Sequence, residues 1–210
     1  MRITAASMHL SKTSPGLRAV ALLALLSAWS VGRADEPVAG PSAEIPHRSF
    51  ASALKPRGFF TQFGVADEVT AGTAGAIWNV HFDPLSPRWS VYLEASVSRW
   101  QSRDAHPSEH GVLTQVALIP VFRYRLDEGR SPWFVEGGVG ATATSSIYRH
   151  GKTRFSTSFN FGDHVGVGYS FGEASRNEIA LRVEHFSNAG IKHPNPGKNF
   201  LELRYVRHFE

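Results

Sequence analysis

The 210-residue chain contains no cysteine, so disulfide bonds cannot hold its fold together. Beyond residue 31 it also lacks an apolar run of the roughly 20 residues that a membrane-spanning helix needs. A packed core or a closed sheet must therefore stabilise the chain. If the part beyond residue 31 enters a membrane, it must do so as β-strands.

The first 34 residues have the features of a secretory signal peptide. An apolar run, AVALLALLSAWSV at 19–31, is followed by Gly32-Arg33-Ala34, and it is preceded by three cations, Arg2, Lys12 and Arg18. The run is too short for a comfortable transmembrane helix. Cleavage after Ala34 is therefore favoured over an uncleaved anchor.

The remainder of the chain has no excess of either charge. The whole sequence holds 22 basic and 18 acidic residues, for a formal charge of +4. Residues 1–34 contain four of the cations and no acidic residue, which leaves 18 basic and 18 acidic residues in 35–210. The high isoelectric point thus comes from the signal segment, and we expect no binding to nucleic acid.

From Pro56 to the C-terminus, eight segments alternate between apolar and polar residues. They span 57–66, 73–83, 88–102, 111–126, 131–145, 156–171, 177–188 and 199–209. The joints alternate between short ones (DPLSP, DEGRSP, GEASRN) and longer ones (ADEVTAG, SRDAHPSEHG, IYRHGKTR, NAGIKHPNPGK). Strict alternation is typical of an up-and-down barrel of the outer membrane, with tight periplasmic turns and longer outer loops.

The distribution of side chains supports this architecture. Aromatic residues on the apolar face gather at the ends joined by short turns, as in a girdle at a lipid–water interface: Phe59, Phe82, Trp89, Tyr124, Trp133, Phe171 and Phe209. The other face carries a charged set: Glu94, Arg123, Arg125, Glu136, Glu178, Arg182, Glu184, Glu202 and Arg204. We predict an all-β, eight-stranded antiparallel transmembrane barrel with a packed polar interior, rather than a porin or a soluble lipocalin-like barrel.

Three parts follow from this interpretation. Residues 1–34 form the cleaved signal peptide, and residues 56–210 form the barrel in the outer membrane. Residues 35–55 between them are rich in Pro, Ala and Ser without periodicity, which predicts a periplasmic tail.

A histidine and a serine lie at the outer end of the segment 177–188. His185 and Ser187 share the odd, lipid-facing register of Leu181 and Val183. Polar groups are costly in lipid, which offers no hydrogen-bond partner. The pair therefore either carries this cost or has reached the headgroup level, where polar groups cost little. Residues i and i+2 of a strand lie roughly 6–7 Å apart on one face, which allows His185 to act as general base for Ser187.

The residues that follow could complete a hydrolytic site. Backbone N–H groups of Asn188-Ala189-Gly190 and the Asn188 amide could face a developing oxyanion. Lys192, His193 and Lys198 could meet phosphate groups, or simply keep the loop soluble. A hydrolase that faces outward at this level would meet outer-leaflet lipid, which in a bacterial outer membrane is lipopolysaccharide.

The stretch HFSNAGIKHPNPG (185–197), together with FNFGDHVGVGYSF (159–171), resembles the PagL family of lipid A 3-O-deacylases. The resemblance implies that Ser187 attacks the ester at the 3 position of lipid A and that His185 takes the serine proton. It implies that Asn188, Gly190 and Asn195 serve oxyanion stabilisation or loop shape. It implies no metal and no organic cofactor.

One position departs from the family pattern. Where the family carries an acidic third member, at the start of the last strand, this chain has Asn199. An asparagine carbonyl can orient the His185 ring but cannot stabilise an imidazolium by charge. Two carboxylates compete for the role: Asp163, which shares the lipid-facing register and falls opposite His185, and Glu202, whose register points inward.

Rival functions remain open from the sequence. A small non-catalytic barrel for adhesion or structure, including an inactive relic of the family, would need no lipid-facing His/Ser pair. An outer-membrane acyltransferase would need a pocket for a second acyl acceptor, which no motif marks. A homodimer is also left open, since a second barrel could shield the polar lipid-facing patch.

Overall fold

The computed structural model describes residues 55–80, 86–103, 111–151 and 153–209. The predicted signal peptide and residues 35–54 of the predicted tail lie outside them, so both stay predictions. Among the described residues, no helix has the length and hydropathy needed to cross a bilayer.

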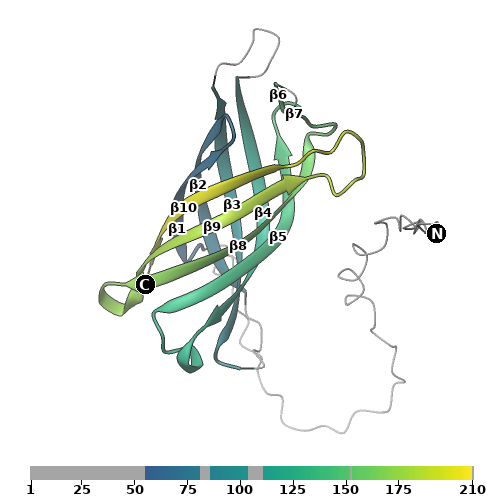
Figure 1. Ribbon diagram of the computed structural model, residues 1–210. Helices are drawn as coiled ribbons and strands as arrows, with labels where there is room; N and C mark the ends of the chain where they lie inside the picture. Colours follow the sequence, from purple (N-terminus) through teal and green to yellow (C-terminus); the bar gives the residue numbers. More distant parts are fainter. Residues whose placement is uncertain (1–54, 81–85, 104–110, 152, 210) are drawn as a thin grey trace, which may run out of the picture. The chain divides into compact units, whose positions relative to one another are not determined.

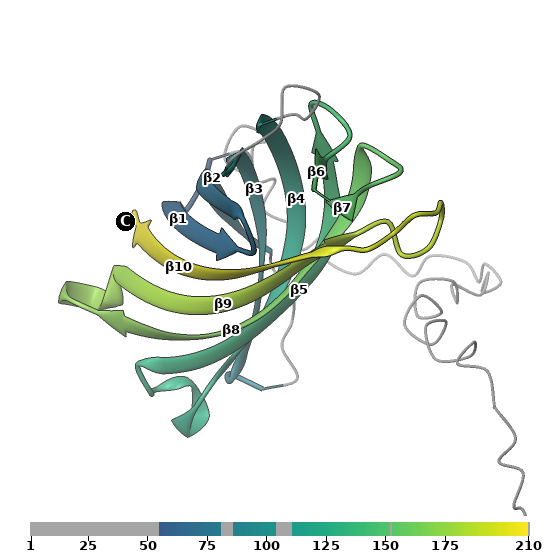
Figure 2. The same cartoon turned by 45° about the horizontal axis from the view of Figure 1, so that its top comes forward.

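Eight strands close into an antiparallel barrel in the order β1-β10-β9-β8-β5-β4-β3-β2 (Figures 1 and 2). Their bounds are Gly58–Ala66 (β1), Val69–Val80 (β2), Trp89–Ser102 (β3), Val112–Arg125 (β4), Trp133–Thr144 (β5), Phe159–Phe171 (β8), Asn177–Ser187 (β9) and Lys198–His208 (β10). Two further strands, β6 (Arg149–His150) and β7 (Thr153–Arg154), form a separate small hairpin. The predicted fold class is confirmed.

One loop prediction was wrong. The joint ADEVTAG is not a long loop, because β1 ends at Ala66 and β2 begins at Val69. Val69 and Ala71 are buried in the barrel, and this burial extends the strand through residues that look loop-like in composition. Short and long joints therefore do not alternate strictly.

The outer loop IYRHGKTR is a long joint between β5 and β8, as predicted, and it also contains the β6–β7 hairpin. Tyr148 and Phe155 flank this hairpin, and both are buried. Their burial draws the loop onto the barrel, where its backbone can pair. The contacts that bury these two residues join parts of the chain that are distant in sequence, so the local pattern does not show them.

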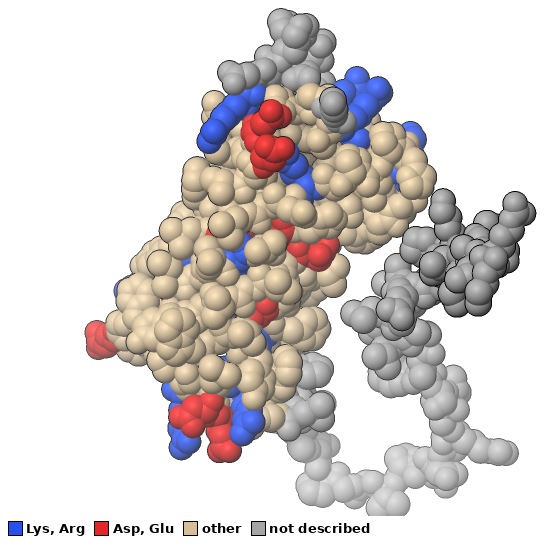
Figure 3. Space-filling model, viewed as in Figure 1, with Lys and Arg blue, Asp and Glu red and all other residues tan. Residues whose placement is uncertain are grey.

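The outward face has the apolar band and aromatic girdle of a membrane barrel. Apart from Phe82, which lies outside the described residues, the predicted girdle residues lie on the outward face. Five of them form close ring pairs, Trp133 with the neighbouring Tyr169, and the ring centroids are 5.0 Å apart for Phe59–Phe209, 5.1 Å for Trp89–Tyr124 and 5.0 Å for Trp133–Tyr169. Charged atoms gather mainly at the two ends of the barrel in Figure 3, and the surface between them is largely uncharged, with a few charged patches. This arrangement suits a bilayer with water on both sides.

The interior holds a chain of ion pairs. Arg182 contacts Glu136 at 2.5 Å and Glu94 at 3.3 Å. Further pairs join Arg123 to Glu136 (2.8 Å), Arg123 to Glu178 (2.7 Å) and Arg204 to Glu94 (3.0 Å). Because buried charges are stable only when paired, each member of this network depends on its neighbours.

The sequence predicted a polar interior, but part of the interior is apolar. Two apolar clusters lie within it, and the one at the outer end contains Val69, Ala71, Trp100, Leu113, Tyr148, Phe155, Phe186 and Phe200. Trp100 is at its centre, with its ring 5.1 Å from Phe186 and 4.7 Å from Phe200. The barrel is therefore plugged by aromatic side chains at its outer end.

Replacing Arg182 with Met should lower the free energy of unfolding by about 3–5 kcal/mol, because Glu94 and Glu136 would lose a buried partner. Urea titration of the protein in lipid vesicles, followed by the gel mobility of the folded form, measures the change. Arg130→Met is the matched control, since the Arg130–Asp127 pair is mostly exposed and should cost about 1 kcal/mol or less. Equal losses in both variants would contradict a stabilising interior network.

Candidate active site

His185 and Ser187 lie at the outer end of β9, on the lipid-facing side. Both side chains are half-buried, whereas the intervening Phe186 points into the barrel and is buried. On one side His185 is the pairing partner of Asp163 in β8, and on the other it is the partner of Asn199 in β10. The closed sheet thus places both predicted partners next to the histidine.

A short hydrogen bond joins the histidine to one of these partners. His185 Nδ1 lies 2.5 Å from Asn199 Oδ1. Because an amide oxygen only accepts hydrogen bonds, Nδ1 must carry the proton. The other ring nitrogen, Nε2, is then left with a free lone pair and can accept a proton, as a general base must.

Gly197 fixes the other side of the imidazole ring. Its φ is +69°, and a Cβ atom built there would overlap His185 Cε1 and approach Nε2 to 3.1 Å. Only glycine therefore allows the loop to pack directly against the ring at this backbone conformation. Sequence reasoning did not single out Gly197 as a site residue, although its place two residues before Asn199 was visible.

The two competing carboxylates lie differently. Asp163 is exposed on the lipid-facing side, and within the described residues it forms no hydrogen bond or ion pair with His185. Glu202 faces the interior, where it accepts a hydrogen bond from Gln62 at 2.5 Å. Of the three predicted candidates, Asn199 is thus the one that the structure bonds to the histidine.

Ser187 ends β9, where the chain turns into the outer loop. Its Oγ accepts a long hydrogen bond, 3.5 Å, from the N–H of Ala189, which adopts a positive φ of 53°. No hydrogen bond links Ser187 to His185 among the described residues. The two side chains share one face at the spacing of i and i+2.

The predicted oxyanion residues organise the loop. Asn188 is buried, and its amide nitrogen donates to Ser156 Oγ at 2.9 Å and to the Lys192 carbonyl at 2.8 Å. Its amide oxygen accepts the Gly190 N–H, and its own N–H donates to Asn195 Oδ1, both at 3.0 Å. Ser156 lies far upstream and was missed, because no local signal links it to this loop.

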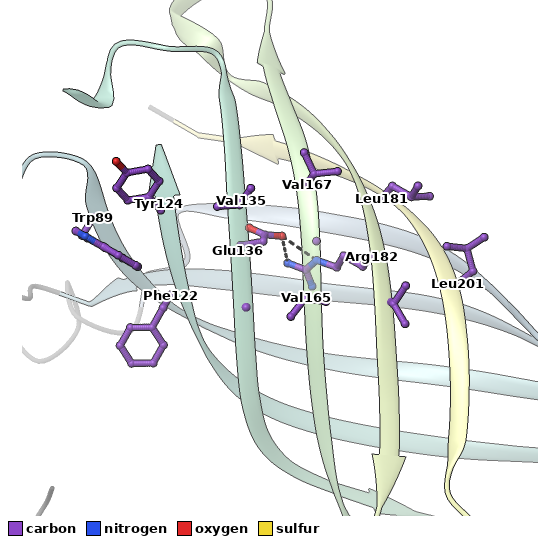
Figure 4. A pocket seen from close by; sticks show the side chains of 13 residues that line it. Trp89, Phe122, Tyr124, Val135, Glu136, Val165, Val167, Leu181, Arg182 and Leu201 are labelled. Carbon is purple, nitrogen blue, oxygen red and sulfur yellow. Dashed lines mark hydrogen bonds and ion pairs between the residues drawn. The ribbon is translucent and has the colours of Figure 1, made fainter. Parts of the chain in front are cut away.

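An apolar groove runs along the lipid-facing wall of the barrel (Figure 4). It has a volume of about 640 Å³ and is lined by Trp89, Phe122, Tyr124, Val135, Glu136, Gly137, Val165, Gly166, Val167, Leu181, Arg182, Val183 and Leu201. Val183 is two residues from His185 and pairs with Val165 and Leu201. The groove therefore approaches the site at Val183, without His185 or Ser187 in its lining, and extends toward the girdle residues Trp89 and Tyr124.

Fold and site together define a class: an integral membrane barrel with a polar His–Asn–Ser arrangement on its membrane-facing surface, beside an apolar groove. A family model described as lipid A 3-O-deacylase (PagL) matches residues 69–208, more than half of the chain. The chain belongs to the PagL family of bacterial outer-membrane ester hydrolases.

Individual relatives agree with this assignment. Lipid A deacylase PagL of Bordetella bronchiseptica is 33% identical over 156 residues, which cover 72% of this chain and 83% of the relative. The protein of the same name from Pseudomonas aeruginosa is 32% identical over 118 residues, which cover 56% of this chain and 64% of the relative. The crystal structure of the outer membrane enzyme PagL matches with a TM-score of 0.59 at 23% identity and covers 72% of this chain and 99% of that one, which supports the fold.

Gly197→Ala should displace the His185 ring and reduce esterase activity by about 100-fold, the scale expected for an ångström-sized misplacement of a reacting group. Gly72→Ala is the control, since a Cβ at Gly72, in β2, meets nothing within 4 Å. The imidazole NMR signals of His185 should shift only in Gly197→Ala. Unchanged signals and activity in that variant would contradict the packing role of Gly197.

Proposed function

We propose that this protein is an outer-membrane serine esterase that hydrolyses the 3-O-linked acyl chain of lipid A, with Ser187 as nucleophile and His185 as general base. The observation that carries the proposal is the His185 Nδ1–Asn199 Oδ1 hydrogen bond, on a lipid-facing surface two residues from Ser187. That bond leaves Nε2 as a base. Membership of the PagL family supplies the substrate class.

The reaction takes two steps. His185 Nε2 removes the Ser187 hydroxyl proton as Oγ attacks the acyl carbonyl, and the imidazolium then returns the proton to the departing sugar oxygen. Water, activated by the same nitrogen, attacks the acyl-enzyme and releases the fatty acid and the free serine. The Ser187–His185 hydrogen bond forms as substrate binds, since such bonds are often long or absent before that.

Of the loop residues near Ser187, some hold the loop together and one can donate a hydrogen bond to an oxyanion. The Asn188 amide and the Gly190 N–H are used within the loop, as is the Asn195 side chain. We assign these three residues to loop shape. The Ala189 N–H, whose bond to Ser187 Oγ is long at 3.5 Å, is the donor that can turn to the developing negative charge.

The apolar groove, whose lining reaches Val183 two residues before His185, fits the acyl chain of the substrate. Its walls are apolar, and it opens to the bilayer rather than to water. A chain that lies in it places its ester end at the level of His185 and Ser187, while the sugar stays near the outer loops, where Lys192 is exposed. Lipid A in the outer leaflet has this geometry, with sugars at the surface and acyl chains in the membrane.

The homodimer that the sequence left open is a separate, untested prediction.

Ser187→Ala should abolish deacylation. Lipid A from cells that make the wild-type protein should lack one hydroxyacyl chain by mass spectrometry, whereas cells that make the variant should retain it. Ser102→Ala, at the outer end of β3 and away from the site, is the control and should behave as wild type. Identical lipid A from wild type and Ser187→Ala would leave the non-catalytic barrel as the better explanation.

Asn199→Ala should lower kcat by about 10–100-fold, because the His185 ring loses its orienting acceptor. Asp163→Asn keeps the Asn199–His185 bond and should cost less. Both variants are compared by kcat in detergent micelles, with the gel mobility of the folded form as the control for folding. A larger loss in Asp163→Asn than in Asn199→Ala would make Asp163, not Asn199, the third member.

A further inference from the structure

Two arginines face each other on the small β6–β7 hairpin. Arg149 and Arg154 are direct pairing partners, so their side chains lie on one face of the hairpin. Like charges that are directly opposite in a two-stranded pair destabilise it unless a counter-charge lies between them.

No such counter-charge occurs in the part of the chain that the structure describes. There, neither Arg149 nor Arg154 forms an ion pair or a side-chain hydrogen bond, and Arg149 Nε is buried without a partner. The carboxylate of Glu68 contacts His150 Nε2 at 3.1 Å instead. Because successive residues of a strand point to opposite faces, Glu68 lies on the other side of the hairpin.

The hairpin is held in place by the aromatic cluster inside the barrel. Tyr148 and Phe155 flank the arginine pair, and the Phe155 N–H donates to the Tyr148 carbonyl at 3.0 Å. Their rings are 5.4 Å apart, and Tyr148 packs 5.8 Å from Trp100. The two guanidinium groups are therefore carried on an anchored element, which lowers the entropic cost of binding a ligand.

The pair also lies close to the proposed active site. Ser156 is two residues after Arg154, about 7 Å of extended chain. Its Oγ accepts a hydrogen bond from the amide of Asn188, the residue after Ser187. Arg154 is thus linked to the nucleophile through one short segment and one hydrogen bond.

We propose that Arg149 and Arg154 bind a phosphate group carried by the sugar headgroup of the lipid substrate. The planar forks of two guanidinium groups suit the oxygens of a phosphate dianion. The negative charge of the bound phosphate would also offset the repulsion between the two guanidinium groups. The inference rests on the proposed function, since it assigns the substrate's charged headgroup to this hairpin and its acyl chain to the groove. Inorganic phosphate shares the chemistry and is the competing source of the anion.

The test measures binding with full-length protein in detergent micelles, in the Ser187→Ala background, so that no turnover occurs. Two probes are used: bisphosphorylated lipid A and the same lipid after enzymatic dephosphorylation. Without further changes the protein should bind the phosphorylated lipid at least about 10-fold more tightly. Arg149→Gln/Arg154→Gln should remove this preference and leave binding of the dephosphorylated lipid unchanged. Arg99→Gln/Arg103→Gln removes the same charge from the outer end of β3 and should keep the preference.

Three results would overturn the inference: equal weakening for both lipids, equal effects of the two double variants, or an unaltered preference in Arg149→Gln/Arg154→Gln. Inorganic phosphate should compete only with the phosphorylated lipid; phosphate binding without any lipid preference would identify a free-anion site and reject the headgroup. Arg149→Lys/Arg154→Lys, which keeps the charge and loses the forks, should retain part of the preference. The readout is binding, so failure of the esterase proposal would appear separately, as absence of turnover by the wild-type protein or as turnover by Ser187→Ala.

Discussion

The closure of the sheet is the constraint on which everything else in this protein depends. Lipid offers no hydrogen-bond partner to a backbone edge, so the first strand must pair with the last, and β1 pairs with β10. In a closed sheet each residue then faces either lipid or the interior, according to its parity. That rule puts His185 and Ser187 in contact with the membrane and puts Glu184 and Phe186 inside. A site for a membrane-embedded substrate needs only that two reactive residues share the outward parity.

The interior supports this outward site from behind. Phe186 lies between His185 and Ser187 in β9, and Phe200 follows Asn199 in β10; both pack on Trp100. The same cluster anchors the β6–β7 hairpin through Tyr148. One set of aromatic rings therefore fixes the strands that carry the histidine and its partner, and the loop that carries the arginine pair. Below this cluster the ion pairs around Arg182 fill the rest of the interior with charges that must stay together.

Most of the fold followed from local pattern, because a period of two is written directly into each strand. The register also followed where turns are short: counting back from GEASRN correctly placed Asp163 opposite His185. The features that the sequence did not predict depend on contacts between residues that are distant in sequence. Val69 and Ala71 look like loop residues until the interior buries them, and Ser156 has no visible tie to Asn188. The roles of Asn188 and Gly190 in loop shape could not be separated from oxyanion roles before their hydrogen-bond partners were known.

Asn199, which stands where the family pattern has an acid, lacks the charge of an acid but also avoids its desolvation cost. A carboxylate there would stabilise the imidazolium of His185, but on a lipid-facing surface its own desolvation is costly while the site rests. A neutral amide avoids that cost and still fixes the proton on Nδ1, since its oxygen only accepts. The remaining need is charge during the reaction itself. Asp163 lies opposite His185 on the other neighbouring strand, on the same outward face as Asn199, so a carboxylate there meets the same desolvation cost. Asn199 therefore accounts for the orientation of the His185 ring, whereas none of the described residues bonded to that ring carries a charge.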